Sequence, residues 1–195
     1  FYQYRHFGYA FEYIGRIAQC SKAFLVGITS LFTPYADDAL KTAEAVRTCH
    51  PGCKIVLGGH HPTVMPMRVL ENPAVDFVIR GEGEKPLLML ARALRSGSFA
   101  GSIPGIATRH HVDSQLKVVP QFLESLDDLP LPAMHLIDPD YYRRGQGNSI
   151  ALVTSRGCPM TCSYCAVGAG GYIPYRRRSL ASVLAEIDLA ASRFD

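Results

Sequence analysis

Three apolar runs, each followed by a polar loop and a helical segment, constrain the fold of this chain more than any other feature. They cover residues 23–28, 54–57 and 75–79. Predominantly apolar runs of this length are typical of strands that are buried on both faces of a sheet. Because strands that alternate with helices form parallel sheets with helices on both faces, the sequence predicts an α/β domain over residues 1–119.

The segments around these runs have apolar residues at helical spacing or the composition of turns. We expect helices over residues 7–18, 35–48, 67–70 and 85–95. A final pair of strands is expected at residues 103–108 and 116–119, with His110 and His111 as solvated residues of the polar turn between them.

The loops after the three strands are expected to gather along the carboxyl edge of the sheet, because crossovers between parallel strands are right-handed. Glycine in these loops lets a flat ligand or a phosphate approach the backbone closely. The three loops are rich in Gly, Ser, Thr and His, and a ligand is expected to bind there. No G-x-G-x-x-G follows the first strand, so the pattern alone is that of any flavodoxin-like or Rossmann-like domain. An equally open interpretation is that Gly81 and Gly83 only permit tight turns.

A cysteine motif lies near the C-terminal end of the chain. Cys158, Cys162 and Cys165 have the spacing C-x-x-x-C-x-x-C and follow the apolar, strand-like residues 150–153. Closely spaced thiolates hold iron–sulfur clusters, whereas a tetrahedral zinc site needs a fourth ligand. No Cys or His follows the motif, and the nearest His before it is His135. The motif therefore suits a four-iron cluster with one open iron, and the three sulfurs should converge within reach of one such cluster. A zinc knuckle with a distant ligand, an electron-carrying cluster and unligated thiols stay open as alternatives.

This spacing, with Tyr164 before the last cysteine, resembles the signature of radical S-adenosylmethionine (SAM) enzymes. The resemblance implies that Cys158, Cys162 and Cys165 bind a [4Fe-4S] cluster and that Tyr164 lies near the SAM adenine. In that family the open iron binds SAM, and an electron from the cluster cleaves SAM to a 5′-deoxyadenosyl radical. A reductant such as flavodoxin or ferredoxin would supply that electron. Residues 149–195 would then form the beginning of a radical SAM (β/α) partial barrel.

The order of the three glycine-containing loops is similar to that of the cobalamin-binding domain that precedes many radical SAM domains. The resemblance implies that the first two loops line the pocket for the dimethylbenzimidazole tail of cobalamin, through Thr29, Ser30, Leu31, Gly58 and Gly59. The third loop would lie near the tail or the corrin edge, through Gly81 and Glu82.

The D-x-H-x-x-G motif, whose His binds cobalt in some cobalamin domains, is absent. When Gly8 is matched to its last position, Gln3 and Arg5 stand where the Asp and the His would be. Cobalamin is therefore expected to lack that His ligand here. His60 and His61 are other candidates for cobalt contact, but they follow the Gly-Gly loop, which favours hydrogen bonding to the tail or to the loop backbone.

The composition excludes several other classes of protein. The formal net charge of +3 is small and spread along the chain, which does not indicate nucleic-acid binding. No run is long enough to span a membrane, and no sequence like a signal peptide opens the chain. The six cysteines are clustered, so reduced thiols in the cytoplasm are expected. The chain begins at Phe1 rather than Met and stops at the end of an apparent helix, so we expect a fragment. The resemblance to cobalamin-binding domains implies a further strand before Phe1.

The sequence after residue 119 differs from the preceding domain in its periodicity and composition. Residues 120–148 contain Pro130 and Pro132 and little periodicity, so they are expected to form an extended linker. Ser179 is expected to cap a helix, whose apolar side would carry Leu180, Val183, Leu184 and Ile187. The basic run 176–178 either anchors a SAM carboxylate or a substrate phosphate, or is a solvated helix entry.

The two resemblances together imply a cobalamin-dependent radical SAM enzyme. Such an enzyme would transfer a methyl group to an unactivated carbon or phosphorus atom of a small-molecule substrate, although relatives use the same cofactors for ring formation or rearrangement. Lipid, tetrapyrrole and peptide substrates all stay open. Two alternatives from other classes are a non-catalytic cobalamin-binding module and an iron–sulfur electron-transfer protein. The isolated fragment is expected to be inactive, because further SAM and substrate contacts would lie beyond Asp195.

Overall fold

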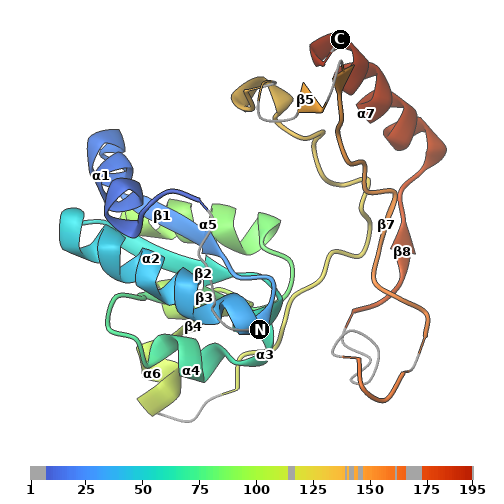
Figure 1. Cartoon of the computed structure of the whole chain (residues 1–195). Helices are drawn as coiled ribbons and strands as arrows, with labels where there is room; N and C mark the ends of the chain where they lie inside the picture. Colours follow the sequence, from blue (N-terminus) through green and yellow to red (C-terminus); the bar gives the residue numbers. More distant parts are fainter. Residues whose placement is uncertain are drawn as a thin grey trace. The chain divides into compact units, whose positions relative to one another are not determined.

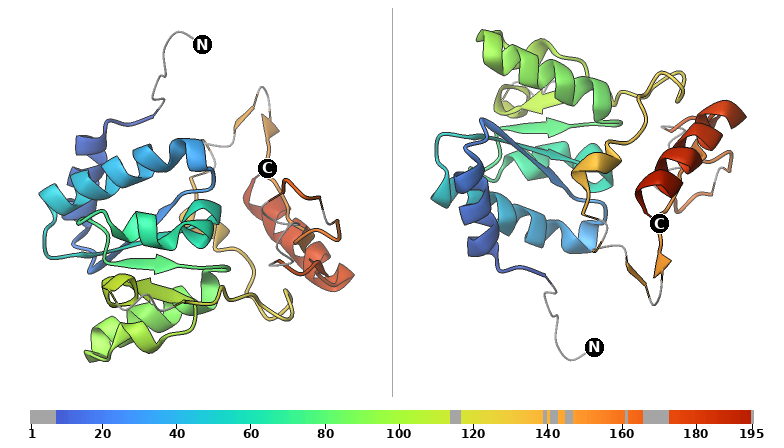
Figure 2. Two further views of the ribbon diagram at one scale, coloured as in Figure 1. Left: turned by 90° about the horizontal axis from the view of Figure 1, so that it is seen from below. Right: turned by 90° about the horizontal axis from the view of Figure 1, so that it is seen from above.

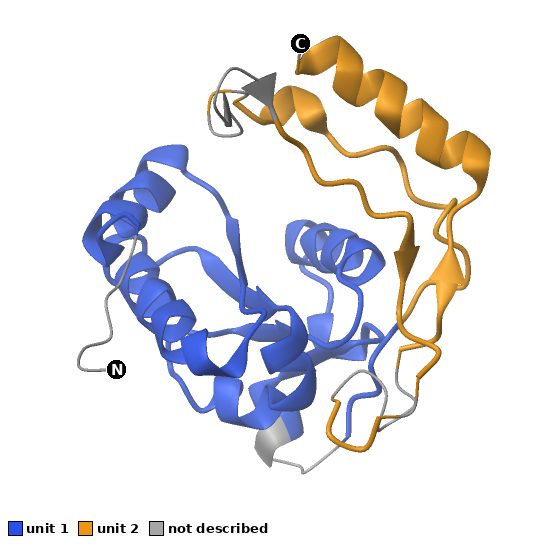
Figure 3. Ribbon diagram, turned by 45° about the vertical axis from the view of Figure 1, so that its right-hand side comes forward, with its two compact units in different colours: residues 1–121 blue, residues 122–195 orange. Residues whose placement is uncertain are grey.

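The computed structural model describes residues 8–113, 117–138, 140, 143–144, 147–160, 162–165 and 173–194. The chain divides into two compact units, Phe1–Gln121 and Phe122–Asp195 (Figure 3). Within the described residues, no helix has the length and apolar character needed to cross a membrane.

Unit 1 is built around a four-stranded sheet with the strand order β1-β2-β3-β4 (Figure 1). The strands are β1 Leu25–Thr29, β2 Lys54–Gly58, β3 Phe77–Ile79 and β4 Ile106–Thr108. The first three are parallel, and β4 pairs with β3 in the antiparallel sense. The predicted α/β domain with a parallel sheet is therefore confirmed, with one antiparallel strand added at its edge.

Helices cover both faces of this sheet, as Figure 2 shows. They are α1 Phe11–Ser21, α2 Ala36–Cys49, α3 His60–Val64, α4 Pro66–Leu70, α5 Glu84–Ser96 and α6 Arg109–Asp113, with 3-10 turns η1 Thr33–Tyr35 and η2 Ala100–Ser102. Alternate residues of β2 enter different cores: Ile55 and Leu57 pack with Val46 of α2, while Val56 packs with Leu90 of α5. This alternation is the period of two that a strand imposes on its side chains.

Three predictions for this unit differ from the structure. Helix α1 begins at Phe11 rather than at residue 7, and residues 1–7 lie outside the described part. Residues 117–119 are not in a strand, and α6 follows β4 in place of the predicted turn. His111 helps to begin that helix, because its Nδ1 accepts the backbone N–H of Thr108 at 3.1 Å. A side chain that bonds the nearby backbone in this way competes with strand pairing.

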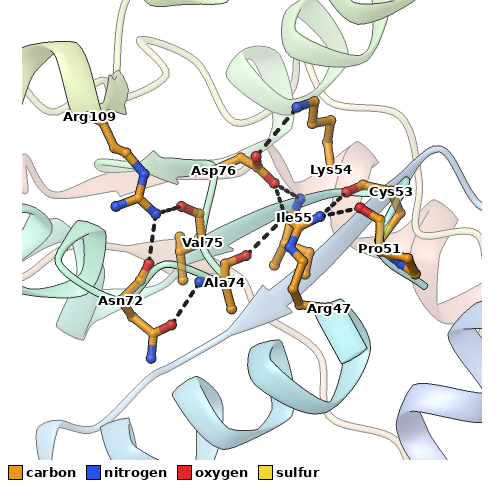
Figure 4. Close-up of polar contacts among 10 residues, drawn as sticks. All are labelled: Arg47, Pro51, Cys53, Lys54, Ile55, Asn72, Ala74, Val75, Asp76 and Arg109. Atoms are coloured by element: carbon orange, nitrogen blue, oxygen red, sulfur yellow. Dashed lines mark hydrogen bonds and ion pairs between the residues drawn. The ribbon is translucent and has the colours of Figure 1, made fainter. Parts of the chain in front are cut away.

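The amino edge of the sheet is held together by Arg47 and Asp76 (Figure 4). Arg47 Nη2 lies 2.5 Å from Asp76 Oδ2, which also accepts the backbone N–H of Ile55 at 2.8 Å. Arg47 Nη1 donates to the carbonyl oxygens of Pro51 and Cys53 at 2.8 and 2.7 Å. Loops at this edge are therefore fixed by bonds to a guanidinium group, and the opposite, carboxyl edge is the one lined with glycine.

A second arginine closes the same edge beside β3. Arg109 donates to the carbonyl oxygens of Leu70 at 2.9 Å, Asn72 at 2.9 Å and Val75 at 3.0 Å (Figure 4 shows the last two). These bonds tie the end of α4 to the start of β3, which satisfies carbonyl groups that no strand or helix pairs.

Unit 2 contains two short antiparallel pairs, a 3-10 turn and one long helix. These are β5 Arg143–Arg144 with β6 Gly147–Asn148, β7 Ser155–Arg156 with β8 Arg176–Arg177, η3 Met134–Leu136 and α7 Leu180–Arg193. The predicted strand at residues 150–153 is wrong, because these residues have no ladder partner among the described strands. An extended run becomes a strand only where another strand pairs with it.

The start of α7 follows the prediction, but its apolar side does not. Ser179 Oγ accepts the backbone N–H of Ser182 at 3.1 Å, which confirms the predicted N-cap. Leu180, Leu184 and Ile187 are exposed, whereas Glu186 is only 5% exposed. The buried side of α7 is therefore organised by a charged residue.

Candidate functional site

The loops that follow β1 and β2 meet at the carboxyl edge of the sheet. The backbone N–H of Ser30 donates to Gly58 O at 2.8 Å, and that of His61 donates to Ser30 O at 3.2 Å. Gly59 has φ +109°, and a Cβ at this position would lie 2.5 Å from Ser30 O. Only glycine therefore permits this close approach of the two loops.

The loop that follows β3 joins them through Thr63 of α3. Thr63 Oγ1 donates to Gly59 O at 2.8 Å and accepts the backbone N–H of Gly81 at 3.0 Å. On its other side, the loop pairs with Gln121, whose carbonyl oxygen accepts the backbone N–H of Glu82 at 2.7 Å. The three loops thus gather at one edge, as the sequence predicted.

Thr63 and Gln121 are the residues of this edge that sequence reasoning missed. The position of Thr63, four residues after Gly59 and eighteen before Gly81, carries no recognisable motif. The feature of the sequence that could have indicated Thr63 is its hydroxyl group, one helical turn after a Gly-Gly loop. At that position a Thr side chain can donate to the carbonyl oxygen of the residue four positions earlier.

Ser30 supplies a polar group that is suited to a ligand. Its side chain is 4% exposed, and among the residues that the structure describes, its Oγ is the one buried side-chain polar atom without a hydrogen-bond partner. Burying a hydroxyl without a partner costs about 1–3 kcal/mol, so such a group points to a missing acceptor or donor. Its neighbours Thr29 and Leu31 are exposed, and Gly58 and Gly59 are half-buried.

The two adjacent histidines have different environments. His60 is exposed, whereas His61 is 5% exposed and its Nδ1 lies 3.1 Å from Thr33 Oγ1. Burial lowers the pKa of His61 below its ordinary value, and the positive charge of Arg68 adds to the effect. A neutral His61 therefore holds the loop after β1, in line with the expectation that it bonds within the loops. Gln3 and Arg5, which stand at the Asp and His positions of the absent D-x-H-x-x-G motif, lie outside the described residues.

The cysteine loop is closed at its base by the β7–β8 pair. Gly157, with φ +82°, lies so close to the carbonyl oxygen of Pro174 that a Cβ would collide with it. Cys158 is exposed, Cys162 and Cys165 are half-buried, and no disulfide joins any of them. The backbone N–H of Cys165 donates to Cys162 O at 3.1 Å.

The three sulfurs do not form a preassembled set of ligands. Within the described ranges, no three Cys, His, Asp or Glu side chains are grouped as a metal ion requires. The expected convergence of Cys158, Cys162 and Cys165 is thus not seen, because spacing brings thiols within reach of one cluster but the loop backbone decides where they point. The donor set itself fits, since three soft thiolates in eight residues suit an iron–sulfur cluster. Tyr164 is 90% exposed, and Thr161 and residues 166–172 lie outside the described part.

The three arginines after the loop bond to protein groups of unit 2. Arg178 pairs with the buried carboxylate of Glu186 and donates to Val153 O at 3.1 Å. Arg176 donates to Pro174 O at 3.0 Å, and Arg177 donates to Tyr175 Oη at 2.8 Å. These bonds favour a structural role at the base of the cysteine loop over the anchoring of a carboxylate or a phosphate.

Asp127 completes this base. Its two carboxylate oxygens accept the backbone N–H of Ser179, each at 3.1 Å. This hydrogen bond lowers the pKa of Asp127 below its ordinary value. The carboxylate therefore stays ionised at the N-terminus of α7, where negative charge is favoured.

Comparisons with known proteins identify the first unit. Residues 3–91 match the family model described as the B12 binding domain. An uncharacterized methyltransferase of Pyrococcus horikoshii is 29% identical over 177 residues, which cover 89% of this chain and 38% of that protein. An anaerobic magnesium-protoporphyrin IX monomethyl ester cyclase of Rubrivivax gelatinosus is 30% identical over 186 residues, covering 89% of this chain and 32% of that protein. The chain thus spans well under half the length of these curated relatives.

A solved structure extends the likeness to nearly the whole chain. It is that of TsrM from Kitasatospora setae, a radical S-adenosylmethionine methyltransferase with cobalamin and a [4Fe-4S] cluster bound. The two structures align with a TM-score of 0.65 and 22% sequence identity, over 93% of this chain and 38% of TsrM, and this likeness shows the fold. The B12-binding match, the sequence relatives and the C-x-x-x-C-x-x-C motif lead to one conclusion: the chain belongs to the family of radical SAM enzymes that carry a cobalamin-binding domain.

Proposed function

We propose that this chain is part of a cobalamin-dependent radical SAM methyltransferase, which acts on an unactivated carbon or phosphorus atom of a small molecule. The observation that carries the proposal is the presence, in one chain, of a B12-binding domain and a three-cysteine loop. Methyl transfer is supported by the names of the Pyrococcus relative and of TsrM.

Cobalamin would bind along the carboxyl edge of unit 1. The buried Ser30 hydroxyl is available to a polar group of the tail, and Gly58 and Gly59 leave the backbone open to a flat ligand. Thr29 and Leu31 would line the same pocket. Gly81 and Glu82 would lie near the tail or the corrin edge, with the Gly81 backbone held by Thr63.

The [4Fe-4S] cluster would be held by Cys158, Cys162 and Cys165, and Tyr164 would lie beside the adenine of SAM. The chemistry available from these groups, when bound, is the transfer of a methyl group by cobalamin and of an electron from the cluster to SAM. The loop that carries the thiols is fixed at its neck by the β7–β8 pair, and we expect a flavodoxin or a ferredoxin to be the reductant.

Anaerobic reconstitution tests this function. The full-length protein that contains this chain is loaded with iron, sulfide and hydroxocobalamin and desalted, and 5′-deoxyadenosine formed from SAM is measured after addition of a low-potential reductant. We expect SAM cleavage that is lost when Cys162 is changed to Ala. An intact cluster without SAM cleavage would refute the radical SAM assignment, and loss of cobalt on desalting would refute the cobalamin assignment.

A second candidate function is ring formation, which the Rubrivivax cyclase relative favours. The two functions differ in the fate of the SAM methyl group. With SAM that carries an isotopic label in its methyl group, a methyltransferase places the label in its product. A cyclase cleaves SAM and leaves the product unlabelled. A non-catalytic cobalamin module or an electron-transfer protein would cleave no SAM at all.

A further inference from the structure

All of the polar groups of Thr63 form hydrogen bonds, and together these bonds connect the loop that follows β2 with the loop that follows β3. Its Oγ1 donates to Gly59 O at 2.8 Å and accepts the backbone N–H of Gly81 at 3.0 Å. Its own backbone N–H donates to Gly59 O at 3.1 Å. Its carbonyl oxygen accepts Arg80 Nε at 2.9 Å. One half-buried side chain thus joins two loops whose glycines are 22 positions apart in the sequence.

Both glycines are already in close contact on their other sides. Gly59 has φ +109° and lies against the backbone of Ser30, while Gly81 has φ +91° and lies against the backbone of Gln121. Neither loop can move towards those neighbours, because backbone atoms fill the space where a Cβ would be. The hydroxyl of Thr63 bonds to both loops at once, and it therefore helps to set their spacing.

We propose that Thr63 is a positioning residue of the cobalamin site, whose hydroxyl fixes the distance between the Gly59 loop and the Gly81 loop. This inference rests on the proposed function. Thr63 acts through the two glycine loops, since its hydroxyl proton is given to Gly59 O and its acceptor side is taken by the Gly81 N–H. Arg80 helps to hold Thr63 in place. Its Nε donates to the Thr63 carbonyl oxygen, and its guanidinium group also donates to Val118 O.

The change Thr63→Val keeps the shape of the side chain and removes the hydroxyl. The N–H of Gly81 then loses the acceptor that holds it, and the two loops can separate. A lost hydrogen bond in a pre-organised site is expected to weaken hydroxocobalamin binding about tenfold. Thr63→Ser keeps the hydroxyl and should bind within about twofold of the unchanged protein.

A matched control is Thr48→Val, because the Thr48 hydroxyl bonds only the carbonyl of Glu44 in its own helix, at 2.9 Å. Hydroxocobalamin affinity is measured by absorbance titration of the purified protein. Amide hydrogen exchange of the cobalamin-free protein is the second measurement. It should show faster exchange at Gly81 in Thr63→Val, and unchanged exchange there in Thr63→Ser and Thr48→Val.

Each outcome decides between distinct conclusions. Weaker binding in Thr63→Val, rescued by Ser and accompanied by local exchange at Gly81, supports the inference. Unchanged affinity in Thr63→Val overturns it while the proposed function stands. Faster exchange throughout unit 1 in that variant also overturns it, because the role of Thr63 would then be general stability. Failure of the unchanged protein to bind hydroxocobalamin overturns both the proposed function and the inference.

Discussion

Replacing Gly59 by alanine should strongly destabilise unit 1. The residue has φ +109°, a conformation that an L-residue with a Cβ adopts at a cost of about 1–3 kcal/mol. The added Cβ would also lie 2.5 Å from Ser30 O and 2.9 Å from Ser30 C. Because both atoms belong to the backbone, the contact cannot be relieved by rotating a side chain.

The two effects can be added to give an expected magnitude. Forcing an extra methyl group into a closely packed position costs about 1–3 kcal/mol, so Gly59→Ala should lower the free energy of unfolding by roughly 2–6 kcal/mol in total. A domain of this size is stable by about 5–15 kcal/mol, so the loss is a large fraction. At about 4 °C per kcal/mol, the melting temperature should fall by roughly 8–24 °C.

Alanine substitutions at two other glycines distinguish the cost of backbone strain from the cost of steric collision. Gly97 has φ +71° but open space around it, so Gly97→Ala should show strain alone, about 1 kcal/mol. Gly27 in β1 has open space and no positive φ, and Gly27→Ala should change stability by less than about 0.5 kcal/mol. Urea unfolding followed by circular dichroism gives the three values. The reasoning is refuted if Gly59→Ala costs no more than Gly97→Ala.

Three further changes have expected outcomes of their own. Glu186→Ala leaves the half-buried Arg178 without its carboxylate and should destabilise unit 2 by about 3 kcal/mol in urea unfolding, whereas the change of the exposed Asp188 to Ala on the same helix should have little effect. Burial lowers the pKa of His61 in the folded protein, so as the pH falls this side chain is protonated in the unfolded chain before it is protonated in the folded one. The free energy of unfolding should therefore decrease as the pH drops below about 6.5. His61→Gln should reduce this pH dependence, measured by melting at several pH values, and exposed His60→Gln should not; equal curves for both would contradict the assignment. Cys158→Ala should lower the iron content measured after reconstitution without changing hydroxocobalamin affinity, and retained iron would exclude Cys158 as a ligand.

The parts of the fold that local patterns determine were predictable from the sequence. The apolar run of β2 and the helical spacing of α2 mark buried elements of a parallel sheet. The prediction that the first apolar run is buried on both faces is wrong, because β1 lies at the end of the strand order and its residues are half-buried or exposed. The capping of α7 by Ser179 depends on residues three positions apart, which a sequence motif can show. The gathering of the glycine loops followed from the handedness of parallel crossovers.

What could not be predicted depends on residues far apart in the sequence. The antiparallel pairing of β4 with β3 and the bonds of Thr63 to Gly81 are set by tertiary contacts that no periodicity encodes. The leucines of α7 are exposed while Glu186 is buried and paired with Arg178, an arrangement that helical spacing alone does not predict. The apolar residues 150–153 have strand propensity, but strand formation also requires a partner.

The central claim is that one chain binds both cobalamin and an iron–sulfur cluster, and metal content tests it most directly. Cobalt and iron are measured per chain after anaerobic reconstitution with hydroxocobalamin, iron and sulfide, followed by desalting. We predict about one cobalt and about four irons per chain, with the irons lost and the cobalt kept when Cys158, Cys162 and Cys165 are all changed to Ala. Cobalt without iron, or iron without cobalt, in the unchanged protein would contradict the account.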